Sequence, residues 1–158
     1  MRIMIDGVDG AGKSSVCEKL ANKFGCNIIR LTYGGDRSIA AYYEMMKCDN
    51  VVHDRTFMSE VIYPKYFERK SRLNLDEIPF LFEMSKRFDA KMFILTASSQ
   101  TIQNRIRERG DEYIKDIDKF TEINLDYLNY AREHDICIID TTDKTIDEVV
   151  EEIGGYLV

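Results

Sequence analysis

The stretch GVDGAGKS, residues 7–14, decides the fold of this chain. It matches the pattern G-x-x-x-x-G-K-[ST] at every fixed position. The mainly apolar residues 3–6 before it suit a short buried strand, and residues 14–24 after it have the apolar spacing of an amphipathic helix. A strand, a glycine-rich turn and a helix in this order form a loop whose backbone N–H groups can surround phosphate. A glycine-rich turn that binds nothing is the weaker interpretation.

Each residue type in this loop has a chemical reason. Its glycines let the backbone turn N–H groups inward without Cβ clashes. We expect the Lys13 ammonium to reach the β- and γ-phosphates of a nucleotide and the Ser14 hydroxyl to bind Mg²⁺. The sequence therefore predicts ATP and Mg²⁺ as cofactors. The expected phosphate-binding residues are Gly10, Ala11, Gly12, Lys13, Ser14 and Ser15.

The remainder of the chain alternates apolar runs with amphipathic segments. We expect further strands at residues 27–31, 51–54, 91–96 and 136–140. We expect further helices at residues 39–47, 57–69, 75–88, 98–109, 117–133 and 143–153. This alternation predicts an α/β protein in which helices cover both faces of a parallel sheet. Ligands are then expected at the carboxyl ends of the strands.

Composition narrows the possible classes of protein. The chain has 158 residues, which suits one domain over residues 1–158, and its formal net charge of −6 argues against a general nucleic-acid coat protein. Four cysteines without a C-x-x-C pair, together with two histidines, argue against a zinc site. No stretch approaches the ~20 apolar residues of a membrane span. We expect a cytoplasmic protein with no membrane and no stable nucleic-acid partner.

Residues 5–15 resemble the phosphate loop of the thymidylate kinase family. That family carries an acidic residue, a glycine, a variable residue and then Asp-Gly-x-Gly-Lys-[ST]. Asp6 and Asp9 fall on the two acidic positions. The resemblance implies that Asp9 contacts the 3′-hydroxyl of the acceptor nucleotide. It also implies the three-layer fold of P-loop kinases, with five parallel strands in the order 2-3-1-4-5, and the possibility of a homodimer.

A second resemblance lies in DRTFMSEVIY, residues 54–63, which is similar to the family's DRYxxSxxAYQ. The matching residues are Asp54, Arg55, Ser59 and Tyr63. The resemblance implies that Arg55 holds the acceptor phosphate with its planar fork and that Asp54 lies near Mg²⁺ or its water shell. Ser59 and Tyr63 are further acceptor-site candidates. The same stretch also resembles deoxynucleoside kinases, which carry Glu-Arg-Ser followed by Ser-Asp.

A third resemblance, to the lid of these kinases, begins in residues 104–112. Arg105 and Arg109 are four residues apart and share a helix face, whereas Arg107 points elsewhere. The resemblance implies a short lid at about residues 105–116, whose arginines clamp the transferring phosphoryl group while one of them stacks on adenine. Residues 138–143 are similar to the loop of the adenine pocket, which makes Thr141 and Thr142 candidates together with Arg105.

The chain departs from both families between the second and third strands. Thymidylate kinases carry Arg-Glu-Pro-Gly-Gly and Ala-Ala-Asp-Arg there, whereas residues 32–50 contain only the turn at residues 33–35. The Glu-Pro that supplies a base in deoxynucleoside kinases is absent, which favours an acceptor that is already anionic. Asp36 and Asp54 remain candidate bases. Among the aromatic residues, Tyr42 and Phe57 are candidate contacts to the acceptor base.

These features predict a kinase. We expect ATP-dependent phosphoryl transfer to a (deoxy)nucleoside monophosphate resembling dTMP or dUMP, which yields the diphosphate. One alternative is a kinase of nucleoside or polynucleotide 5′-hydroxyl groups. Another is a nucleotide-binding regulatory module without transfer. The catalytic candidates are Lys13, Asp54, Arg55, Arg105 and Arg109.

Overall fold

A single parallel sheet lies at the centre of the protein. The computed structural model describes residues 1–32, 34–110 and 117–157. The strands within these ranges are β1 (Arg2–Gly7), β2 (Asn27–Arg30), β3 (Val51–Asp54), β4 (Ala90–Thr96) and β5 (Cys137–Asp140). Every pair is parallel, and the order β2-β3-β1-β4-β5 confirms the predicted topology.

The central strand β1 aligns the elements that carry the sequence motifs. Ile5, which is wholly buried, pairs with Asp54 on β3 and with Phe93 on β4. The backbone N–H of Arg55 continues this ladder with a 2.9 Å hydrogen bond to the Ile5 carbonyl. The start of the phosphate loop and the Asp54-Arg55 pair therefore emerge side by side at the carboxyl edge of the sheet.

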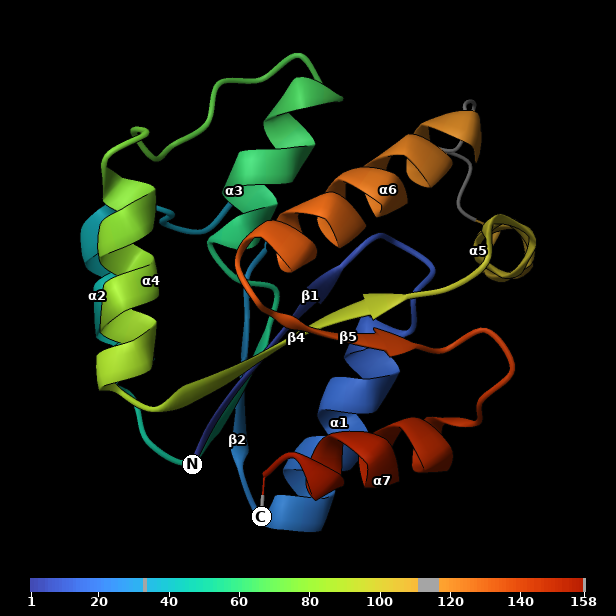
Figure 1. Cartoon of the computed structure of the whole chain (residues 1–158), viewed down its shortest axis with the longest axis horizontal. Coiled ribbons are helices and arrows are strands. Elements are labelled where there is room, and N and C mark those ends of the chain that lie inside the picture. Colours follow the sequence, from blue (N-terminus) through green and yellow to red (C-terminus); the bar gives the residue numbers. More distant parts are fainter. Residues whose placement is uncertain (33, 111–116, 158) are drawn as a thin grey trace.

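Helices cover both faces of this sheet. They are α1 (Lys13–Phe24), α2 (Ile39–Lys47), α3 (Met58–Ile62), α4 (Glu77–Arg87), α5 (Ser99–Glu108), α6 (Ile117–Glu133) and α7 (Ile146–Gly155). Figure 1 shows α1 and α7 packed together on one face, while α3, α4 and α6 lie on the other. This is the predicted three-layer α/β arrangement. None of the helices in the described ranges has both the length and the apolar character needed to cross a bilayer.

Two expected helix ends differ from the structure. The helix predicted over residues 57–69 ends at Ile62 and is followed by a 3₁₀ turn, η1 (Tyr63–Lys65). Pro64 explains the break, because proline has no N–H to donate and its ring clashes with the carbonyl four residues earlier. The last helix is capped by Thr145 rather than by Asp143, since Thr145 and Glu148 form a reciprocal capping box.

Candidate active site

The phosphate loop has the backbone that its glycines predict. Gly7 has a φ of 134°, and a Cβ added there would lie 2.2 Å from the Leu95 carbonyl oxygen, so no side chain fits. Gly12 adopts a left-handed conformation, with a φ of 88°, at the start of α1. No side chain among the described residues caps this helix, and its first turn is free of acidic residues. Its N–H groups therefore face a position suited to an anion.

The side chain of Lys13 is folded onto the loop itself. Its Nζ donates a 2.8 Å hydrogen bond to the Val8 carbonyl and lies 3.7 Å from a carboxylate oxygen of Asp9. Burial and the nearby Arg55 charge lower the pKa of Lys13 to about 8, and neighbouring carboxylates only partly offset them. The ammonium group therefore gains stabilisation from any anion that enters the loop.

Asp9 forms an ion pair with Arg55, which connects the phosphate loop to the residue that follows β3. Arg55 has a φ of 76°, a left-handed conformation that costs a non-glycine residue about 1 kcal/mol or more. Its guanidinium carbon lies 4.9 Å from the centre of the Tyr63 ring. Although burial opposes ionisation of Asp9, the charges of Lys13 and Arg55 hold its pKa below the ordinary value.

Asp6, to which the sequence assigned no role, is the centre of a buried network. Its carboxylate accepts hydrogen bonds from the backbone N–H groups of Gly7 and Thr56, each 2.9 Å long. It also accepts from the hydroxyls of Thr56 at 2.8 Å, Ser59 at 3.0 Å and Tyr127 at 2.8 Å. The carboxylate thereby fixes both chain segments that flank Arg55. The acidic position of the family motif was the available signal, but the partners come from distant segments.

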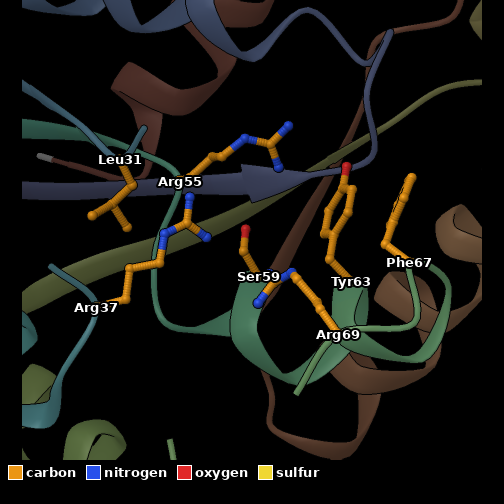
Figure 2. A pocket seen from close by; sticks show the side chains of 7 residues that line it. All are labelled: Leu31, Arg37, Arg55, Ser59, Tyr63, Phe67 and Arg69. Atoms are coloured by element: carbon orange, nitrogen blue, oxygen red, sulfur yellow. The ribbon is translucent and has the colours of Figure 1, made fainter. Parts of the chain in front are cut away.

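A cavity of about 410 Å³ opens beside Arg55 (Figure 2). It contains three of the predicted acceptor-site residues, Arg55, Ser59 and Tyr63, and Asp9 reaches it through its ion pair with Arg55. The sequence analysis did not identify the other lining residues, which belong to no motif. These are Leu31, Arg37, Phe67 and Arg69.

The structure places two predicted acceptor contacts elsewhere. Tyr42 is 2% exposed and Phe57 is wholly buried, and their rings meet edge to face with centroids 6.3 Å apart. Neither residue lines the cavity. Both belong to the hydrophobic core, because the apolar faces of α2 and of the segment before α3 pack toward the sheet.

A second cavity, of about 280 Å³, lies at the other side of the phosphate loop. The expected donor-site residues Gly12, Ser15, Arg105, Arg109 and Thr141 line it, whereas the exposed Arg107 does not. The sequence analysis missed the remaining lining residues, which include the apolar side chains that would contact a nucleotide base. These are Val16, Glu108, Lys144, Ile146 and Val149.

Arg105 and Thr142 have partners that limit their roles. Arg105 donates to the Gly10 carbonyl at 3.2 Å and to the hydroxyl and carbonyl of Thr141 at 2.9 and 2.8 Å. It therefore braces the phosphate loop against the segment after β5. The Thr142 hydroxyl accepts from the Ser98 N–H and donates to Asp140, outside the cavity. Residues 111–116 of the expected lid lie outside the described residues.

The expected Mg²⁺ residues fit a hard cation. Ser14 is exposed in the first turn of α1, where its hydroxyl is accessible. The Asp54 carboxylate lies at the end of the adjacent β3 and is 3.4 Å from Arg30 Nε. Hydroxyl and carboxylate oxygens are the ligands that Mg²⁺ uses beside water and phosphate oxygens.

Comparisons with known proteins agree with this geometry. The family model described as "Thymidylate kinase" matches residues 28–153. The chain is 31% identical over 159 residues to "SPbeta prophage-derived uncharacterized protein YorR" of Bacillus subtilis (strain 168), covering 96% of this chain and 95% of the relative. It is 27% identical to a "Probable thymidylate kinase" of Methanocaldococcus jannaschii, with 99% and 95% covered.

A solved structure matches over the same extent. The crystal structure of Bacillus subtilis YorR "in complex with phosphorylated GDP" superposes with a TM-score of 0.82 at 26% identity, covering 99% of this chain and 95% of that one. The family model starts beyond the phosphate loop, so the loop is identified independently by its own pattern at residues 7–14. The chain belongs to the thymidylate kinase family of P-loop nucleotide kinases.

Proposed function

We propose that the protein transfers the γ-phosphoryl group of ATP to the phosphate of a (deoxy)nucleoside monophosphate and so yields the diphosphate. The observation that carries this proposal is the cavity beside Arg55. The guanidinium groups of Arg37, Arg55 and Arg69 line it, and Arg55 is paired with Asp9 of the phosphate loop. A phosphate acceptor matches this concentration of cations, whereas a neutral hydroxyl does not need it.

The donor nucleotide is proposed to occupy the phosphate loop and the 280 Å³ cavity beyond it. Lys13 exchanges its contact with the Val8 carbonyl for the β- and γ-phosphates, and Arg109 lies on the side of the lid. Ser14 and Asp54 hold Mg²⁺, which neutralises phosphate charge when it is bound. Charge that develops on the transferred group is then met by cations on both sides.

The acceptor phosphate is proposed to bind Arg55. Because the Asp9 carboxylate occupies that guanidinium in the present structure, the incoming phosphate competes with it. Displaced from Arg55, Asp9 is available to the sugar hydroxyl of the acceptor, as the family resemblance implies. The two cavities lie on opposite sides of the loop, an arrangement that suits in-line transfer.

The structure offers little support for a hydroxyl acceptor. A hydroxyl benefits from a general base within hydrogen-bond reach. Neither candidate base, Asp36 or Asp54, lines the 410 Å³ cavity. Asp36 is exposed and accepts the Ser38 N–H, and Asp54 lies beside Arg30. The monophosphate is therefore the acceptor we favour.

The relatives point to more than one base. The family name favours a dTMP- or dUMP-like acceptor, while the YorR crystal contains a phosphorylated GDP. The decisive experiment measures ADP release from ATP and Mg²⁺ with each common monophosphate and each matching nucleoside. We expect turnover with at least one monophosphate and none with nucleosides. A Lys13→Ala variant should lose activity by orders of magnitude. Phosphorylation of nucleosides alone would refute the proposal in favour of a hydroxyl kinase.

A further inference from the structure

Glu60 holds two of the cavity arginines in place. Its side chain is wholly buried, and it accepts hydrogen bonds from Arg37 Nη1 at 2.7 Å and from Arg69 Nη1 and Nη2 at 2.9 and 3.2 Å. The backbone N–H of Arg72 supplies another at 3.1 Å. One buried carboxylate thus fixes two guanidinium groups that come from segments far apart in the sequence.

These two arginines lie apart from the phosphate-loop end of the cavity. Arg55 marks that end, because it pairs with Asp9. In Figure 2, Arg37 and Arg69 lie on either side of Ser59, below Arg55. A nucleotide whose phosphate contacts Arg55 therefore directs its sugar and base toward Arg37 and Arg69.

Stacking on Tyr63 cannot decide which base enters. The guanidinium of Arg55 lies 4.9 Å from the centre of that ring, and Phe67 is parallel to it within 17° with centroids 5.6 Å apart. Both neighbours are thus already stacked on Tyr63. Since stacking tolerates any base, discrimination has to come from hydrogen bonds.

The polar side chains that line the cavity are mainly donors. Arginine only donates hydrogen bonds, and the Ser59 hydroxyl already donates to Asp6. Among the described lining residues there is no Asp, Glu, Asn or Gln. Glu60 itself is covered by the arginines that it holds. A base that offers an acceptor therefore finds partners here, and a base that offers an amino group does not.

Resting on the proposed function, we propose that Arg37 and Arg69, positioned by Glu60, select acceptor bases that present a ring carbonyl. Guanine, hypoxanthine, thymine and uracil belong to this class, whereas adenine and cytosine present an amino group at the corresponding position. An amino group facing a guanidinium leaves two donors opposed and unpaired, which is costly in a buried site. The selection acts on base-edge chemistry, so it includes purines as well as pyrimidines.

The test uses pairs that differ chiefly in this one group. Calorimetric titration of the full chain compares dUMP with dCMP and dIMP with dAMP. We expect each carbonyl member to bind on the order of 10- to 100-fold more tightly than its amino partner. In Arg69→Met we expect the ratio to fall to about threefold or less, while ADP affinity is unchanged. Lys70→Met, an exposed neighbour that does not line the cavity, should retain the full ratio.

Three outcomes would overturn the inference. These are equal affinities within both pairs, a ratio that survives in an Arg37→Met, Arg69→Met double variant, or tighter binding of diphosphates without base preference. The last would assign these arginines to a second phosphate. The same comparison with deoxyuridine and deoxycytidine separates this inference from the proposed function. If only nucleosides are phosphorylated but deoxyuridine is preferred, base selection stands and the monophosphate assignment falls.

Discussion

The hydroxyl of Tyr127 donates a 2.8 Å hydrogen bond to the carboxylate of Asp6, which joins α6 to the end of β1 across 121 residues. Ser59 takes part in the same contact, since its hydroxyl lies 3.2 Å from that of Tyr127 and 3.0 Å from Asp6. The carboxylate also fixes Thr56, the residue after Arg55. A buried network of this kind holds the acceptor side of the site in one arrangement.

We predict that Tyr127→Phe lowers the free energy of unfolding by about 1 kcal/mol, because it removes one hydrogen bond from a buried acceptor. Asp6→Asn should cost more, about 2–4 kcal/mol, since its amide NH₂ then faces groups that donate. Urea denaturation of the two variants measures both effects. A Tyr127→Phe variant as destabilised as Asp6→Asn would show that the ring rather than the hydroxyl matters.

The fold was predictable because its determinants are local. The loop glycines, the alternation of strands and helices and the helix stop signals all lie within short windows, and the sheet order followed from the family resemblance. The errors were local too. Pro64 was read as compatible with a helix that it ends, and Asp143 was chosen as a cap over Thr145, whose partner Glu148 completes the capping box.

Arg55 is expected to contribute side-chain chemistry at a cost in backbone strain. Arg55→Gly and Arg55→Ala should both reduce kcat/KM for the acceptor by about 10²–10³-fold, because each removes the guanidinium group. Arg55→Gly should be the more stable of the two by about 1 kcal/mol, since glycine adopts a φ of 76° without strain. Steady-state kinetics and thermal denaturation test the pair. Equal stabilities would mean that the left-handed conformation is not retained in solution.

Lys13 should make nucleotide binding depend on pH. Its pKa is about 8 in the unliganded protein, and a bound triphosphate raises it by stabilising the ammonium form. Below pH 8 the group is already charged. As the pH rises above 8, binding takes up a proton, so ATP affinity should fall by nearly tenfold per pH unit. Calorimetry at pH 9 in two buffers of different ionisation enthalpy measures this uptake. Lys13→Arg stays charged, so uptake equal to that of the native protein would contradict the assignment.

His53 should limit stability in acid. It is buried on β3, and its Nε2 has no hydrogen-bond partner within the described residues. Burial, and then the charge of Arg2, lower its pKa from 6.5 to about 4. Below pH 6.5 the unfolded chain binds a proton that the folded protein excludes, so about 3 kcal/mol of stability is lost between pH 6.5 and 4. Denaturation at several pH values should show a smaller acid loss in His53→Val. An unchanged acid loss would assign it to other groups.

The acceptor site was less predictable than the fold because its parts meet only in three dimensions. Arg37 and Arg69 belong to no motif, and they line the cavity because both bind Glu60. Tyr42 and Phe57 were chosen for residue type alone, and their burial shows that an aromatic ring near a motif is more often part of the core. Long-range ion pairs and burial leave no short sequence signal.

The lid arginines offer a matched comparison on one helix. Arg109 lines the donor cavity and is exposed, so Arg109→Ala should lower kcat/KM for ATP by about 10–100-fold with stability unchanged. Arg107→Ala removes an exposed charge outside the cavity and should change turnover less than about twofold. Arg105→Ala should lower both activity and unfolding temperature, because it breaks the hydrogen bonds to Gly10 and Thr141. Similar kinetics for the Arg107 and Arg109 variants would remove Arg109 from the catalytic site, since exposure and charge are common to both and only the cavity distinguishes them.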